Sequence, residues 1–517
     1  MTRSAITVIL ISGVQFLFTV LGQAIVTWRF GASKETDAFI LACTPPLIVT
    51  TALSWASSLV AVPIFVKEFA KSGSHQAWRI GSAFVFSAIV VVTLIASLGF
   101  VFSWKLSSAL APGFSAEQLS LASQVMKVCW LSSSVLVVAS VLIAIRNCRE
   151  QFALTSASAL FGPLGTVLGA LLLTEQFGIV GVAIGQFVGT VAQLMLLSSR
   201  IISPNRIWIP TDLGNCKATL RTAAVMAIPV AIGGSVYLLL PCIERFYASE
   251  FGEGAISYLG LAQRLGATVF PILAVGLATP LATKLAKSPE VQSHFQTSGL
   301  LSSVTRGFLV VTIPLVVLSP AYAEPLIRTC FEHGQFTREN TVAVARILPL
   351  YTLGACASAY GTILGRAFSA VFSDTWTPVA ALSGMLVFYV VACELSVRTL
   401  GCEALALASC IYWVFSTAIQ CAVLRFRLGI AGGMRILTVT SCCTISAALT
   451  TVILMVFTPY LSPVAACSAV LVGFVVYAWM AKSVFRVDEV STILRSIRNV
   501  ILYSRFKHQE ACRASSN

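Results

Sequence analysis

The sequence is poor in charge. Only 10% of its 517 residues are Asp, Glu, Lys or Arg, whereas 57% are hydrophobic. A soluble domain carries roughly 25% charged residues, so the composition excludes an ordinary soluble protein. Apolar runs long enough to cross a ~30 Å hydrocarbon core as helices recur between short polar breaks. The composition therefore predicts an all-α integral membrane protein.

Signatures of enzymes are also scarce. The four histidines fall in predicted loops or the tail, and none lies at metal-ligand spacing to another His or a Cys. The sequence has no GxxxxGK phosphate loop, and no GxGxxG follows a strand pattern. Its fifteen cysteines are scattered without paired CxxC motifs, which is typical of small apolar residues in a core. We therefore expect no catalytic residues, no metal and no cofactor.

Hydropathy divides the chain into about fourteen predicted membrane-spanning helices. Each apolar run has the length of one transmembrane helix, and the first is expected to be retained because it lacks a convincing signal-peptidase site. The predicted spans are 5–28, 37–66, 79–104, 121–145, 152–174, 178–199, 220–243, 256–283, 303–323, 340–365, 376–397, 402–424, 433–458 and 462–484.

The basic residues predict the orientation. If the amino terminus is cytoplasmic, 24 of the 34 Lys and Arg residues lie on the inner side, 8 lie outside, and Arg264 and Arg346 fall within spans. This excess favours two cytoplasmic termini and an even number of spans. The net charge of +14 is then explained by topology and by contact with anionic membrane lipids, so we expect no nucleic-acid partner.

Short motifs recur in the same order in the two halves of the chain. Their shared order and spacing indicate a duplicated unit of about two hundred residues, which is typical of a two-lobed transporter. The matched pairs are Phe114-Ser115-Ala116-Glu117 with Phe336-Thr337-Arg338-Glu339, Pro163 with Pro378, and Gly178-Ile179-Val180-Gly181 with Gly401-Cys402-Glu403-Ala404. The phrases Ser115-x-x-Gln118 and Thr337-x-x-Asn340 also resemble helix N-caps, the first of them a capping box.

Arg264 is the leading candidate for substrate binding. It lies about eight residues into its predicted span, or ~12 Å along a helix, where a charge is costly. A guanidinium facing a cavity would suit a phosphate or pyrophosphate, to which it can donate two parallel hydrogen bonds. The alternatives are an internal ion pair with Glu244 or Glu253, or a side chain that reaches the membrane surface.

Other polar residues at the spans are further candidates. Asp37 opens the second span, where it could contact substrate or simply cap its own helix. Gln15 and Gln23 lie eight positions apart on one broad face of the first span. Such side chains either hold helices together or line a wet cavity, and both interpretations remain open.

Several motifs together resemble the MurJ/MviN lipid II flippases, within the superfamily of multidrug, oligosaccharidyl-lipid and polysaccharide exporters. The resemblance extends from about Arg29 to Val379. It is carried by Phe30-Gly31-Ala32, Thr36-Asp37-Ala38-Phe39, Val62-Pro63-Ile64-Phe65, Leu110-Ala111-Pro112-Gly113-Phe114, Gln263-Arg264-Leu265, Leu281-Ala282, His333-Gly334-Gln335-Phe336-Thr337, Arg366-Ala367-Phe368 and Thr377-Pro378-Val379.

The resemblance implies two six-helix lobes around a central cavity, two further helices that form a groove for a lipid tail, and alternating access driven by an ion gradient or membrane potential. We accordingly expect an N-terminal lobe at 1–212, a C-terminal lobe at 213–430, two additional helices at 431–485 and a basic cytoplasmic tail at 486–517.

The sequence departs from the family at its cavity. Lipid II flippases carry arginines where our alignment places Phe16, Gly22 and Thr50, and an acidic residue where this chain has Gln263. Either Arg29 or Arg245 supplies the missing charge, or the substrate is a different polyprenyl-linked glycan, or the chain is a paralogue with altered activity.

The sequence thus predicts a non-enzymatic flippase in the bacterial inner membrane. Its expected substrate is an undecaprenyl-pyrophosphate-linked glycan, with lipid II first and an exopolysaccharide or O-antigen unit second. A cation-coupled exporter of small molecules and a non-transporting scaffold remain alternatives. Membrane lipids are expected partners, together with the cell-wall or polysaccharide synthesis machinery.

Overall fold

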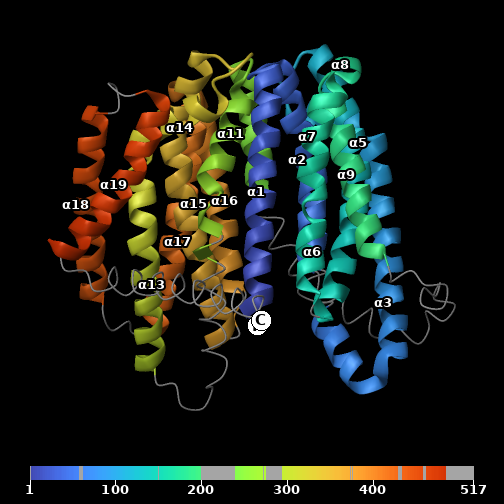
Figure 1. The fold of residues 1–517 in the computed structure, drawn as a ribbon, viewed down its shortest axis with the longest axis horizontal. Helices are drawn as coiled ribbons and strands as arrows, with labels where there is room; N and C mark the ends of the chain where they lie inside the picture. The colour runs from blue at the N-terminus through green and yellow to red at the C-terminus, as the bar shows by residue number, and fades with distance from the viewer. Residues whose placement is uncertain are drawn as a thin grey trace, which may run out of the picture. The chain divides into compact units, whose positions relative to one another are not determined.

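A computed structural model describes residues 2–56, 62–149, 151–199, 239–271, 273–274, 294–372, 374, 376–428, 433–457 and 462–484. Every regular element in these ranges is helical, as Figure 1 shows. The protein is therefore an all-α integral membrane protein, as its composition predicts. Helices suit a bilayer because each one satisfies its own backbone hydrogen bonds.

The first half of the chain supplies nine labelled helices. They are α1 (Thr2–Phe30), α2 (Lys34–Ala56), α3 (Val62–Val101), α4 (Ser103–Leu110), α5 (Ala116–Cys148), α6 (Phe152–Ser158), α7 (Phe161–Leu172), α8 (Thr174–Phe177) and α9 (Val180–Ser198).

The second half contains one 3₁₀ turn, η2 (Ser249–Phe251), and a further series of helices, and residues 239–248 are also helical. The labelled helices are α11 (Ala255–Ala267), α13 (His294–Val317), α14 (Ser319–Phe331), α15 (Arg338–Phe372), α16 (Trp376–Leu400), α17 (Cys402–Leu428), α18 (Gly433–Phe457) and α19 (Pro463–Ser483).

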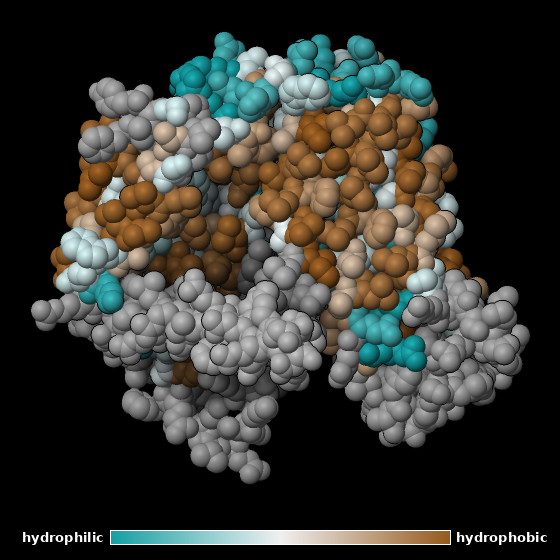
Figure 2. Space-filling model, in the orientation of Figure 1, coloured by the Kyte–Doolittle hydropathy of each residue, from teal (hydrophilic) through white to brown (hydrophobic). Residues whose placement is uncertain are grey.

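Eleven helices in the described ranges are long and apolar enough to cross a membrane, and their sides are mainly hydrophobic in Figure 2. They coincide with eleven of the fourteen predicted spans. Most of 220–243 and part of 256–283 lie outside the described residues, and α19 provides only a shorter apolar helix, Ser468–Ser483. The total of fourteen therefore stays a prediction.

Local sequence signals set several helix ends. Ser115 and Gln118 form the predicted capping box, in which the Gln118 N–H donates to Ser115 Oγ at 3.3 Å and the Ser115 N–H donates to Gln118 Oε1 at 3.0 Å. At the corresponding motif Thr337-x-x-Asn340, the Asn340 N–H donates to Thr337 Oγ1 at 3.5 Å. Both N-cap predictions are confirmed.

The repeated glycine turn is also reproduced. Gly178 and Gly401 both have positive φ, 56° and 67°, a conformation that side chains other than glycine disfavour. Each carbonyl accepts a hydrogen bond at 3.1 Å from the residue three positions on, Gly181 and Ala404 respectively. The same turn therefore precedes α9 and α17.

The chain divides into two compact units. One contains residues 1–260, 331–340 and 393–405, and the other contains 261–330, 341–392 and 406–517. Short segments of the second repeat thus belong to the same unit as the first repeat. The expected lobe boundaries near 212 and 430, and the tail 486–517, lie outside the described residues, so the domain prediction stays a prediction.

Helices α7 and α9 pack backbone to backbone in the first unit, where they run side by side in Figure 1. A Cβ placed on Gly165 would lie 2.3 Å from the Gly185 carbonyl oxygen, and one on Gly189 would lie 2.2 Å from the Phe161 oxygen. A Cβ on Gly185 would lie 2.4 Å from the Gly169 Cα. We did not predict this contact, although glycines at every fourth position are its usual signal in membrane helices.

The second unit is packed by larger side chains. Tyr389 of α16 and Tyr412 of α17 are both 1% exposed and meet edge to face with ring centroids 5.8 Å apart. The Tyr412 hydroxyl donates to the Leu382 carbonyl at 3.1 Å. Helices α18 and α19 pack with α13, where the Tyr477 hydroxyl donates to the Val310 carbonyl at 2.8 Å.

Candidate functional site

Asp37 lies at the centre of a buried polar contact in the first unit. Its side chain is in the first turn of α2, and the residue is 1% exposed. The Gly254 N–H donates to Oδ2 at 2.7 Å, while the Ser257 N–H and hydroxyl donate to Oδ1 at 2.8 and 2.5 Å. The carboxylate therefore caps the N-terminus of α11. It does not cap its own helix, α2, which was one of the two interpretations of the sequence.

This cap is electrostatically favourable. The first amides of a helix lack intrahelical acceptors, and the helix dipole favours a negative charge at that end. A buried carboxylate, in turn, requires several donors to offset its loss of hydration. The three hydrogen bonds meet both requirements and fasten the start of α11 to α2.

Arg245 makes a second contact with α2. Its guanidinium donates to the hydroxyl of Thr44, two turns after Asp37 on the same helix. Between them, a Cβ on Gly260 would lie 3.3 Å from the Ile40 side chain. One edge of α2 is thus held at three levels by residues 245–260.

Three glycines of the family-like motifs, Gly31, Gly113 and Gly334, bring segments that are distant in sequence into backbone contact. A Cβ on Gly31 would lie 2.5 Å from the Gln335 carbonyl oxygen, and a Cβ on Gly334 would lie 2.3 Å from the Trp28 oxygen. The Gln335 N–H donates to that same Trp28 oxygen at 2.9 Å. Gly113 similarly meets Ser249, whose hydroxyl accepts from the Gly113 N–H at 3.3 Å. These contacts explain why the resemblance motifs require glycine there.

A polar cavity of about 400 Å³ lies beside these contacts. Arg29 is on its wall and donates to the Ala170 carbonyl at 3.3 Å and to Glu175 at 3.2 Å. Lys34 forms an ion pair with Glu253 at 2.8 Å. Arg29 and Arg245 therefore already have protein partners in this structure.

The glutamines of α1 are half-buried. The Gln15 and Gln23 backbone carbonyls accept hydrogen bonds from the hydroxyls of Thr19 and Thr27 at 2.9 and 3.0 Å. Both side chains remain candidates for cavity lining.

Arg264 differs from its predicted placement. It lies in the last turn of α11, which ends at Ala267, and its side chain is exposed rather than deep within a continuous span. Pro271 explains the early end, because a proline ring clashes with the carbonyl four residues earlier, which belongs to Ala267. The Arg264 guanidinium therefore lies at a helix end.

The positions where the resemblance predicts arginines are Phe16, Gly22 and Thr50 in this chain. Gly22 of α1 packs near Thr166 and Val167 of α7, and Phe16 is 41% exposed. The Thr50 hydroxyl lies 2.5 Å from that of Ser133, which joins α2 to α5. Gly22 and Thr50 thus lie at contacts between helices.

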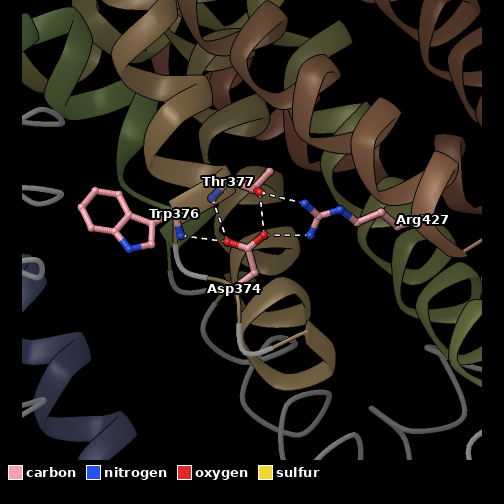
Figure 3. A network of polar contacts seen from close by, with 4 residues as sticks. All are labelled: Asp374, Trp376, Thr377 and Arg427. Atoms are coloured by element: carbon pink, nitrogen blue, oxygen red, sulfur yellow. Dashed lines mark hydrogen bonds and ion pairs between the residues drawn. The ribbon is translucent and has the colours of Figure 1, made fainter.

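A separate polar network joins helix ends in the second unit (Figure 3). Asp374 accepts hydrogen bonds from the Trp376 and Thr377 N–H groups at 2.9 and 3.0 Å and from the Thr377 hydroxyl at 2.6 Å. Arg427 of α17 forms an ion pair with it at 2.7 Å. The hydrogen bonds from Thr377 and the ion pair hold the pKa of Asp374 well below its usual range. We had noted Thr377 only as a motif residue and had not predicted this network.

No cluster of three or more His, Cys, Asp or Glu residues with metal-binding geometry occurs in the ranges that the structure describes. The polar groups instead form helix caps and ion pairs between helices.

Comparison with known proteins identifies relatives of this chain. A sequence model of the family described as Lipid II flippase MurJ matches residues 26–476. A protein of Thermotoga maritima named probable lipid II flippase MurJ is 26% identical over 476 residues, which cover 90% of this chain and 93% of that protein. A Buchnera aphidicola protein of the same name is also 26% identical and covers 66% of this chain and 68% of its own length.

The fold has a counterpart among solved structures. A lipid II flippase MurJ in an inward closed conformation superposes with a TM-score of 0.77 at 20% identity, covering 92% of this chain and 99% of that chain.

Proposed function

Because the chain belongs to the lipid II flippase MurJ family, we propose that it transfers an undecaprenyl-pyrophosphate-linked glycan, lipid II, from the cytoplasmic to the outer leaflet. The observation that carries this proposal is the family match over residues 26–476, which includes ten of the eleven candidate membrane helices entirely and the last five residues of the first. The chain acts as a transporter of the bacterial inner membrane, with both termini cytoplasmic, and receives its substrate from the cell-wall synthesis machinery.

Alternating access requires contacts that form in one state and break in another. The Asp37 cap suits this role, since it joins α2 to the start of α11 by three hydrogen bonds. Each hydrogen bond to a charged group contributes roughly 1.5–3 kcal/mol, and water can replace it when the contact opens. The cap therefore favours the closed arrangement without locking it permanently.

Arg264 is our proposed phosphate ligand. It lies nine residues after the first residue of α11, or ~14 Å along the helix. A helix that begins at the Asp37 cap thus ends with an exposed guanidinium. Phosphate binding at one end and release of the cap at the other are then linked through one rigid helix. Arg29, Arg245, Gln15 and Gln23 serve as secondary polar contacts for the headgroup.

The test of this function is complementation of a bacterial strain depleted of its own lipid II flippase. The wild-type chain restores growth. Arg264→Ala reduces transport roughly tenfold to a hundredfold through the lost charge-assisted hydrogen bonds. Arg264→Lys retains part of it, because an ammonium binds phosphate but lacks the bidentate geometry.

Arg338→Ala is the matched control, since Arg338 is an exposed first residue of α15. It leaves growth unchanged. Full transport by Arg264→Ala at normal membrane abundance would remove the phosphate role. Failure of the well-expressed wild-type chain would argue against lipid II.

The neutral cavity positions favour a second candidate function. Phe16, Gly22 and Thr50 provide no cationic charge for a pyrophosphate, which fits an exporter of another lipid-linked unit, such as an exopolysaccharide or O-antigen repeat. Rescue of a strain that lacks such an exporter, without rescue of the lipid II strain, would select this alternative.

A further inference from the structure

An apolar groove of about 460 Å³ opens on the first unit between α2, α3, α4 and α5. Its walls include Pro45 and Val49 from α2, Leu98 from α3 and Phe102 between α3 and α4, and Trp130 from α5. Helices α2, α3 and α4 each pack against α5 in the same unit. The volume lies within the ~300–1,000 Å³ range of ordinary ligand sites.

Trp130, which lines the groove, carries a buried polar group without a partner among the described residues. The residue is 4% exposed, and its indole N–H has no hydrogen-bond partner among the described residues. Its ring lies directly on the α3 backbone, because a Cβ on Gly99 would be 2.1 Å from a ring carbon. A buried donor without an acceptor costs roughly 1–3 kcal/mol, so a ligand with a carbonyl oxygen would be favoured here.

Two lysines contact aromatic rings beside the groove. Lys105 Nζ is 5.6 Å from the centroid of the Phe102 ring, which lines the groove, and Lys127 Nζ is 5.6 Å from that of Phe100. Lys127 also precedes Trp130 by three positions on α5, which places both on one side of that helix. Trp104, 46% exposed on α4, adds an aromatic ring of the kind enriched at membrane interfaces.

The groove therefore combines three features in one place. Its apolar walls belong to membrane-spanning helices, so the acyl chains of lipids surround them in the bilayer. The indole N–H matches an ester carbonyl, and the ammonium groups match a phosphate. We propose that this groove is a binding site for an anionic phospholipid of the surrounding bilayer, with one acyl chain between α2 and α3 and the phosphate on Lys105 and Lys127.

This site does not depend on the transported substrate. It uses neither Arg264 nor the Asp37 cap, and it would stabilise the packing of α2, α3 and α5. A protein that binds such a lipid only when folded gains stability with lipid concentration.

The experiment is native mass spectrometry of the full-length protein in detergent, titrated separately with phosphatidylglycerol, phosphatidylcholine and undecaprenyl phosphate. We expect one phosphatidylglycerol to be retained in preference to phosphatidylcholine. The double variant Lys105→Gln/Lys127→Gln weakens this binding roughly thirtyfold. Trp130→Phe keeps the apolar wall but loses the donor, and weakens binding of every ester lipid roughly tenfold.

A groove-filling variant and two controls complete the design. Leu98→Trp occupies the groove and reduces retention, whereas Leu94→Trp, at an exposed residue of α3 that does not line the groove, leaves it unchanged. Lys482→Gln, at the end of α19, is the charge control.

Equal retention of phosphatidylcholine and phosphatidylglycerol would overturn the anionic site. Tighter binding of undecaprenyl phosphate would reassign the groove to an isoprenoid chain. Unchanged lipid retention in monodisperse Leu98→Trp protein would place the bound lipid elsewhere.

Discussion

The helix pairs α7–α9 and α16–α17 follow related motifs and are packed in opposite ways. Each second helix begins after the same positive-φ glycine turn, at Gly178 and Gly401. In the first pair, glycines bring the two backbones into contact. In the second, Tyr389 and Tyr412 fill the space between helices. Two hairpins that share this turn are therefore stabilised differently, one by close backbone approach and the other by large aromatic rings.

The ends of these hairpins are also fastened differently. In the first unit, Arg146 donates to the Leu197 and Ser199 carbonyls at 2.8 and 2.5 Å and to Gln151 at 2.7 Å, all of them uncharged. In the second, Arg427 pairs with the charged Asp374. Both arginines join three helix ends, but among the described partners only that of Arg427, Asp374, titrates in acid.

The largest expected effect is on the tyrosine-packed pair. Tyr412→Ala leaves a cavity beside Tyr389 and should lower the free energy of unfolding by about 4 kcal/mol. Tyr412→Phe removes only the hydrogen bond to Leu382 and should cost about 1 kcal/mol. Unfolding in mixed micelles measures both losses of stability. Equal losses would mean that the hydrogen bond of the hydroxyl, and not the packing of the ring, provides the stabilisation.

The glycine-packed pair should respond to an added methyl group. Gly185→Ala places Cβ against the α7 backbone, which must shift, at a cost of about 2 kcal/mol. Gly162→Ala is the control, because a Cβ there meets no atom within 4 Å. It should instead stabilise the helix by up to about 1 kcal/mol. Similar unfolding curves for both variants would show that the close contact is not required.

The smallest effect concerns pH. The pKa of Asp374 is lowered by its hydrogen bonds to Thr377 and its pair with Arg427, so the folded state holds this carboxylate deprotonated more strongly than the unfolded chain does. Its stabilisation is present above the ordinary pKa of 3.8 and is lost as pH falls through the lowered value. The described partners of Arg146 include no carboxylate, so their hydrogen bonds should not change.

Asp374→Asn tests this at neutral pH by imitating the protonated form. Hydrogen exchange at the Trp376 and Thr377 amides should accelerate in the variant, while exchange near Ser199 stays unchanged. Acceleration at both junctions would indicate global loosening rather than loss of one ion pair.

Signals between neighbouring residues made part of the fold predictable. The capping box at Ser115 depends on residues three positions apart, and hydropathy located eleven spans because each is decided by its own composition. The glycine contact of α7 and α9 had a readable pattern that we overlooked. Pro271 likewise indicates an end to the helix that contains Arg264, but the apolar run continues past this proline and led us to predict one span.

Partners distant in sequence were not predictable. Asp37 was identified as a candidate, yet its donors are 217 and 220 residues away. The partner of Arg245 is likewise 201 residues distant, and no local pattern specifies such a pair. Only tertiary packing determines whether these groups meet each other or a ligand.

The Asp37 cap also has a consequence for biosynthesis. The ribosome makes this carboxylate 217 residues before Gly254, the first amide it binds. At roughly 5–20 residues per second, the nascent chain carries an unsatisfied acid for about 10–40 s. A chain truncated before residue 254 never acquires the missing donors. Its Asp37 therefore lacks the hydrogen bonds that offset burial of this carboxylate in the folded protein.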